Sequence, residues 1–139
     1  MNNIETYVLD THAWIWQLFN PSKLGQQAKQ ILEQADNNDG VKIIIPAVVL
    51  AEVCMIAQKQ RIANFKPEHI SILVSTVKQH PAYSLSTLND QIILASQQFT
   101  DIPDIFDRLI ATETYLLNAH LVSCDSIIRA SQVKHLLVW

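Results

Sequence analysis

Two aspartates follow directly on short apolar runs, where a charged side chain needs an explanation. Asp10 comes after the run YVL and Asp125 comes after LVSC. Each carboxylate could cap a following helix, a position for which aspartate is a preferred residue. If both runs are parallel strands of one sheet, their ends lie on the same edge and the two carboxylates are neighbours. Taken alone, either aspartate fits both roles.

Glu52 is the most informative single residue. It lies in the segment AVVLAEVCMIA, where the other ten residues are apolar. A helix that is apolar all round is expected to be buried. A carboxylate inside it costs stability unless it meets a partner or a metal ion. The structural alternative is a salt bridge to one of only ten lysines and arginines.

Asp104 and Asp107 stand three residues apart in the segment PDIFDRLIATETYLL. At the start of a helix this spacing puts both carboxylates on one face, near the positive end of the helix dipole. Capping explains Asp104 well, with Asp107 at the third helical position, but it explains Asp107 less well. Arg108 beside them is a candidate to pair with an acid or with a phosphate.

Several carboxylates in one pocket repel each other, by roughly 1 kcal/mol per pair at 4 Å in water and about 4 at an effective dielectric constant near 20. A divalent cation removes this conflict, and an oxygen-only set of ligands suits Mg²⁺ or Mn²⁺. The five histidines are scattered and the two cysteines lie far apart, so no zinc spacing is present. We therefore expect His12 to be a structural or rim residue.

The elements that would position these acids alternate along the chain. We expect a parallel sheet covered on both faces, a three-layer α/β/α sandwich formed by a single domain, residues 1–139. In such sheets, sites form beyond the carboxyl ends of the strands, where the strand order reverses. The patterns predict strands at 4–9, 41–46, 83–86, 120–124 and 135–139, and helices at 12–19, 22–35, 46–60, 67–79, 87–98, 104–118 and 126–132.

The amino-acid composition excludes several classes of protein. The 139 residues are 49% apolar and carry a formal net charge of −3, so a nucleic acid would have to be held by a local patch or a metal ion. With two glycines, the chain has no glycine-rich nucleotide-binding loop. No apolar run is long enough for a transmembrane helix. Cys54 and Cys124 lie in apolar segments, which favours a reduced cytoplasmic protein.

Three segments in this order, VLDTHAWIW, IPAVVLAEV and DIFDRLIATETYLLNAHLVSCD, resemble the PIN domain family and specifically its VapC-like ribonuclease toxins. The resemblance runs from Tyr7 to the final HLLVW. It implies a metal-dependent endoribonuclease, the toxin of a type II toxin–antitoxin system, which binds Mg²⁺ or Mn²⁺ and leaves a 5′-phosphate and a 3′-hydroxyl. The implied partners are an RNA substrate, a cognate antitoxin and a second copy of the chain in a homodimer.

By motif, the resemblance places the family's catalytic, metal-binding acids on Asp10, Glu52, Asp107 and Asp125. It places supporting residues on Thr11, Asp104, Arg108 and Ser123, where serine stands in for the usual threonine. The alternative is a PIN-fold module that binds RNA or a protein without catalysis. A haloacid-dehalogenase-like phosphatase fits poorly, because it needs an aspartate where this chain has His12.

Overall fold

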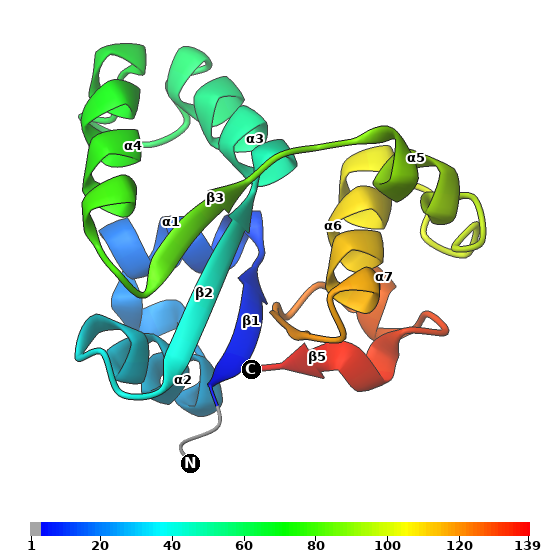
Figure 1. The fold of residues 1–139 in the computed structure, drawn as a ribbon. Coiled ribbons are helices and arrows are strands. Elements are labelled where there is room, and N and C mark those ends of the chain that lie inside the picture. Colours follow the sequence, from blue (N-terminus) through cyan, green and yellow to red (C-terminus); the bar gives the residue numbers. More distant parts are fainter. Residues whose placement is uncertain (1–3) are drawn as a thin grey trace.

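The computed structural model describes residues 4–139, which form one five-stranded sheet with helices on both sides (Figure 1). The strand order is β3-β2-β1-β4-β5, and every neighbouring pair is parallel. Val8 and Leu9 are consecutive in β1 and both fully buried, which requires a covered sheet on each face. The strands are β1 (Glu5–Leu9), β2 (Val41–Pro46), β3 (Tyr83–Ser86), β4 (His120–Val122) and β5 (Leu137–Val138).

Seven α-helices accompany the sheet in residues 4–139. Figure 1 shows the first four gathered on the β2–β3 side and the last three on the β4–β5 side. They are α1 (Thr11–Phe19), α2 (Gln26–Asp36), α3 (Ala47–Gln58), α4 (Ile70–Gln79), α5 (Asp90–Ser96), α6 (Ile105–Leu116) and α7 (Ser126–Arg129). The second helix packs on β2, the fourth on β3, and α6 on β1 and β4. This arrangement confirms the predicted three-layer α/β sandwich.

The strand order reverses between β1 and β4. From β1 the chain proceeds outward through β2 to β3, and then returns to place β4 and β5 on the other side of β1. The amide of Asp10 donates to the carbonyl of Val122 at 3.2 Å, so the carboxyl ends of these two strands are in direct contact. The fold therefore brings the residues after both strands to one point on the rim.

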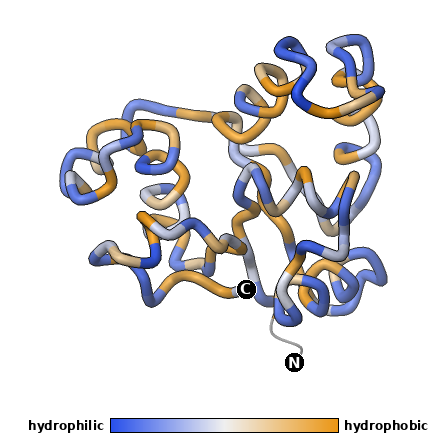
Figure 2. The backbone as a smooth tube through the Cα atoms, turned by 180° about the vertical axis from the view of Figure 1, so that it is seen from behind, coloured by the Kyte–Doolittle hydropathy of each residue, from blue (hydrophilic) through white to orange (hydrophobic). Residues whose placement is uncertain are grey.

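The core consists of the inner strands and the apolar faces of the helices around them. Hydrophobic stretches run along the central strands, whereas hydrophilic stretches lie mainly in the outer turns (Figure 2). Within residues 4–139, every helix is too short or too polar to cross a membrane.

The expected helix over 22–35 is wrong in its first part. Pro21–Lys23 form a short 3₁₀ turn, and α2 begins only after Gly25. A Cβ atom on Gly25 would lie 2.6 Å from both the carbonyl carbon and Cδ1 of Trp139. Gly25 is the N-cap of α2 and has an extended backbone, and Trp139 packs directly on it.

The expected strand over 135–139 is also shorter than predicted. Lys134–Leu136 form a 3₁₀ turn, and only Leu137–Val138 pair with β4. Its neighbour β4 ends at Val122, before the turn that carries Ser123 and Asp125. A longer ladder at this edge therefore has little to pair with.

The helix around Glu52 is not buried on all sides, contrary to its sequence. One face packs in the core through Val48, Val49, Val53 and Ala57, whereas Ala51 is exposed and Glu52 is half-buried. The helix starts at the carboxyl edge of the sheet and packs against α1 and α6, so its other face is left toward solvent.

Candidate active site

Asp10 lies at the centre of the rim and is only 6% exposed. One carboxylate oxygen accepts a hydrogen bond from the Thr11 amide at 2.8 Å, which caps α1. The other accepts from the Ser123 hydroxyl at 2.6 Å. Burial raises the pKa of Asp10, and these two hydrogen bonds oppose the rise. Asp10 therefore caps a helix and also presents a carboxylate to the rim.

Asp125, like Asp10, both caps a helix and presents a carboxylate to the rim. Its Oδ1 accepts from the amides of Ile127 and Ile128, both at 2.9 Å, and so caps the short α7. The amide of Asp125 in turn donates to the Ser123 hydroxyl oxygen at 3.1 Å. Ser123 thus links the two aspartates that follow β1 and β4.

Glu52 reaches the same rim from α3. Its Oε1 accepts from the Thr11 hydroxyl at 2.8 Å, so its partner is a neutral hydroxyl rather than the lysine or arginine of the alternative salt bridge. Burial raises the pKa of Glu52, the Thr11 hydrogen bond lowers it, and the charges of Asp10 and Asp104 raise it further. Glu52 is therefore held among acids.

Asp107 is the residue whose pKa is raised by all four of the other acids. Its pKa rises to about 7, first because of burial and then because of Asp125, Asp10, Asp104 and Glu52. Asp104 also caps α6, since its Oδ1 accepts from the Asp107 amide at 3.0 Å. The fold thus brings all five acids singled out in the sequence into one neighbourhood.

Arg108 does not pair with these acids, one of the two kinds of partner that the sequence suggested, and a phosphate as its partner stays a prediction. Its Nε donates to the carbonyl oxygen of Ile102 at 2.8 Å, and Nη2 lies 3.4 Å from the carbonyl oxygen of Pro103. The guanidinium therefore ties down the loop that leads into α6. Its contribution to the rim is to fix the start of the helix that carries Asp104 and Asp107.

The donor set suits a hard divalent cation, although the side chains do not enclose one as they stand. Across residues 4–139, no three His, Cys, Asp or Glu side chains are grouped closely enough to hold an ion. Among the described hydrogen bonds, none ends on the Asp107 carboxylate, and Glu52 and Asp125 each use only one oxygen. The remaining carboxylate oxygens are the ligand type that Mg²⁺ and Mn²⁺ prefer.

Sequence reasoning missed a further buried acid, Glu113, in the middle of α6. It is 5% exposed, and its Oε2 accepts from the hydroxyl of Ser86 at 2.6 Å. Burial raises its pKa and the Ser86 hydrogen bond opposes that rise. The carboxylate joins α6 to the carboxyl end of β3. The only sign of this residue in the sequence is its helical spacing, which places position 113 on the buried face of α6.

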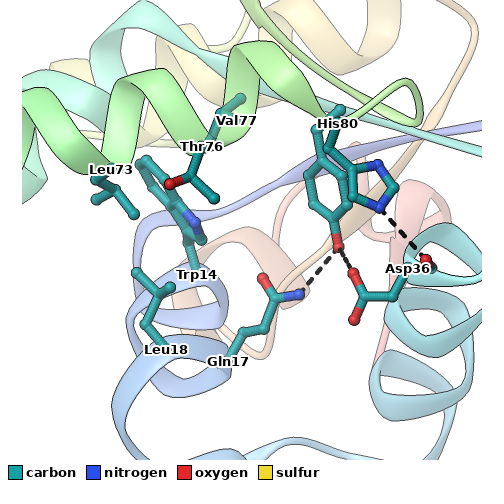
Figure 3. A pocket seen from close by; sticks show the side chains of 9 residues that line it. Trp14, Gln17, Leu18, Asp36, Leu73, Thr76, Val77 and His80 are labelled. Carbon is teal, nitrogen blue, oxygen red and sulfur yellow. Dashed lines mark hydrogen bonds between the residues drawn. The ribbon is translucent and has the colours of Figure 1, made fainter.

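A cavity of about 330 Å³ lies away from the acids, between α1, α4 and the end of α2 (Figure 3). Its polar side is already paired: the Tyr83 hydroxyl donates to Asp36 at 2.6 Å and accepts from Gln17 at 3.0 Å. Apolar side chains such as Leu18 and Leu73 form the opposite wall. None of the rim acids lines this cavity, so it is not part of the candidate active site.

The fold and the rim together define an open α/β sandwich with an acidic site where its strand order reverses. A family model described as PIN domain matches residues 7–133. The chain therefore belongs to the PIN domain family, as its motifs predicted. No curated protein matches the sequence significantly.

Solved structures share this fold at low sequence identity. The chain is similar to one in VapBC2 from Rickettsia felis bound to a DNA fragment of its promoter, with a TM-score of 0.67, 18% identity, and 92% of this chain and 94% of that chain covered. For VapBC-1 from nontypeable Haemophilus influenzae the TM-score is 0.62 and the identity 18%, with 86% of this chain and 87% of that chain covered. For a toxin–antitoxin complex from Klebsiella pneumoniae the TM-score is 0.61 and the identity 17%, with 96% of each chain covered.

Proposed function

We propose that this protein is a metal-dependent endoribonuclease and the toxin component of a toxin–antitoxin pair. The observation that carries the proposal is the convergence of five carboxylates where the strand order reverses: burial, and then the charges of the other four acids, raise the pKa of Asp107. Such a cluster lowers the stability of the fold unless a cation or a proton compensates it. Membership of the PIN domain family supports the same activity.

Asp10, Glu52, Asp107 and Asp125 would hold Mg²⁺ or Mn²⁺ at the rim. A bound divalent cation supplies charge neutralisation at the phosphate and a water of lowered pKa. The protein's own groups orient the acids: the Ser123 hydroxyl fixes Asp10, and the Thr11 hydroxyl fixes Glu52. Asp104 and Arg108 set the start of α6 and so the position of Asp107.

The partners follow from the same proposal. The similar solved structures are toxin–antitoxin complexes, which supports a cognate antitoxin for this chain. Leu94 is 63% exposed and Ile105 is 48% exposed, on neighbouring helices, which supports a second copy as a further partner. Cys54 and Cys124 are free thiols, in keeping with a reducing cytoplasmic environment.

The proposal is tested by incubating the purified chain with a mixed RNA pool in Mg²⁺, in Mn²⁺ and in EDTA. We expect fragments with 5′-phosphate ends in either metal and none in EDTA. A folded protein that binds RNA but produces no fragments in either metal would instead fit the non-catalytic binding module.

A further inference from the structure

A second cavity, of about 220 Å³, opens directly beside the acids. Its lining includes the two aspartates that follow β1 and β4, with Ser123 and Cys124 between them in the rim, and three aromatic residues, His12, Trp16 and Trp139. It therefore continues from the rim into a mainly apolar pocket. Pockets that hold complete drug-sized ligands measure roughly 300 to 1,000 Å³, so this one suits a single planar group.

The aromatic lining is built from two distant parts of the chain. His12 and Trp16 are four residues apart on α1 and therefore share one helical face, with ring centroids 5.8 Å apart. The ring of Trp139 meets that of Trp16 edge-on, with centroids 5.6 Å apart. Trp16 is thus flanked by rings on both sides.

Trp139 is held in place by its backbone as well as by its ring. Its carbonyl oxygen accepts from the Gln27 amide at 3.1 Å, and its own amide donates to the Gln27 side chain at 3.3 Å. Gly25, which has no Cβ, allows the close approach of the indole described above. The pocket wall is therefore formed before any ligand arrives, which limits the entropy lost on binding.

Charge is distributed unevenly around this pocket. The Lys23 ammonium lies 5.8 Å from the centroid of the Trp16 ring, whereas Asp10 and Asp125 are among the residues that line the pocket itself. A ligand that suits these groups has an apolar planar body, a group that a cation held by the acidic rim would bind, and a further negative charge near Lys23.

We propose that this pocket binds one nucleobase of a single-stranded RNA, next to the phosphate presented to the acids. This inference rests on the proposed function and adds to it a site for substrate. Unpaired bases commonly bind proteins by contact with aromatic faces, and such contacts tolerate any base. Lys23 is positioned for an adjacent phosphate of the same strand.

The test uses a short single-stranded RNA that the wild type cleaves at one position, and a set of copies with one abasic nucleotide each. KM and kcat are compared for wild type, His12→Ala, Trp16→Ala and Trp16→Phe, with Phe19→Ala as the matched control. Phe19 also lies on α1, but its ring packs against Phe65 outside the pocket. Thermal unfolding of each variant verifies that it is folded.

We expect His12→Ala and Trp16→Ala to raise KM by about tenfold with little change in kcat, and Trp16→Phe to recover most of the loss. One abasic position next to the cleaved bond should raise the KM of the wild type by a similar factor. The same abasic position should change the KM of Trp16→Ala only a little. Phe19→Ala should behave as wild type with both RNAs.

Two outcomes overturn the inference in distinguishable ways. If the RNA is cleaved but His12→Ala and Trp16→Ala keep the wild-type KM and the wild-type response to abasic positions, the base site is wrong and the nuclease stands. If the wild type neither binds nor cleaves any RNA, the proposed function is wrong and the base site fails with it.

Discussion

The Ser123 hydroxyl donates to the buried carboxylate of Asp10 at 2.6 Å across 113 positions of the sequence. The same oxygen accepts from the amide of Asp125 at 3.1 Å. One small side chain thus connects the residues that follow β1 and β4. Its hydrogen bond also lowers the pKa of Asp10 against the effect of burial, and so favours the charged form that a cation requires.

Replacing this hydroxyl should affect both stability and cleavage. Ser123→Ala leaves a buried carboxylate oxygen and an amide without their partner, which should cost ~1–3 kcal/mol in the free energy of unfolding. RNA cleavage should fall as well, because Asp10 loses its orientation. Ser123→Thr, which keeps the hydroxyl, should retain both properties. Urea unfolding and initial cleavage rates measure the two effects.

Ser131 offers a matched control for Ser123. It is equally buried, donates to the Ile128 carbonyl at 2.7 Å and accepts from the Val133 amide at 3.2 Å, but it lies outside the acidic rim. Ser131→Ala should lose similar stability and keep its cleavage rate after correction for the folded fraction. Equal cleavage by the two alanine variants would contradict a role for Ser123 at the site.

Asp107 should make the metal-free protein less stable as pH rises. The unfolded carboxyl loses its proton near pH 3.8, whereas the folded one keeps it up to about pH 7. Stability from this group is therefore complete below pH 3.8 and is lost progressively up to about pH 7. Because the side chain is half-exposed, we expect a loss of only ~1–2 kcal/mol.

Asp107→Asn should remove that part of the pH dependence. In EDTA the variant should be more stable than wild type at pH 8 and no more stable at pH 3.5, as measured by urea unfolding across this range. Asp39→Asn, an exposed aspartate in the turn before β2, is the control and should follow the wild-type curve. An Asp107→Asn protein that is less stable than wild type at pH 8 would contradict repulsion at the rim.

Glu52→Gln should separate metal binding from stability. Glutamine keeps an oxygen that can accept from the Thr11 hydroxyl. It also removes a negative charge that the carboxylates of Asp10 and Asp104 repel. We expect the metal-free free energy of unfolding at pH 8 to stay the same or rise. Mn²⁺ affinity, measured by calorimetry, should fall by about tenfold or more. A clear loss of metal-free stability would show that the charge itself holds the fold together.

Gly25→Ala should destabilise the C-terminal segment. The added methyl group would meet two Trp139 atoms at 2.6 Å, and such overpacking costs ~1–3 kcal/mol. A changed tryptophan emission spectrum should accompany the loss, since the Trp139 indole must move. Gln26→Ala, at the next and exposed position, is the control. Unchanged stability and emission would show that Trp139 is not fixed by this contact.

The sequence predicted most of the acidic rim because its rules are local. Aspartates after apolar strands must lie at a sheet edge, and the pairing of Leu9 with Val122 then brings the segments that carry Asp10 and Asp125 together. Asp104 and Asp107 follow from helical spacing. The same local rules favoured Asp104 as a helix cap and left capping open for Asp10 and Asp125, and in the structure all three cap helices.

Features that depend on distant contacts were not predictable. The close approach at Gly25 and the edge-on packing of the Trp16 ring both involve Trp139, more than a hundred residues away. Nothing in the spacing of residues 22–35 signals that contact. The open face of α3 was missed for a related reason, because its apolar composition does not reveal that the sheet, α1, α6 and the 3₁₀ turn Pro67–His69 cover only part of the helix.

The most direct test of the account compares RNA cleavage by wild type and Asp10→Asn in Mg²⁺ or Mn²⁺, with Asp39→Asn as the control. Asparagine still accepts from the Thr11 amide and the Ser123 hydroxyl, so the fold should survive, as thermal unfolding would verify. We predict metal-dependent cleavage by wild type and Asp39→Asn, and a loss of at least about a hundredfold in Asp10→Asn. Cleavage by Asp10→Asn at the wild-type rate would contradict the assignment of the rim as the active site.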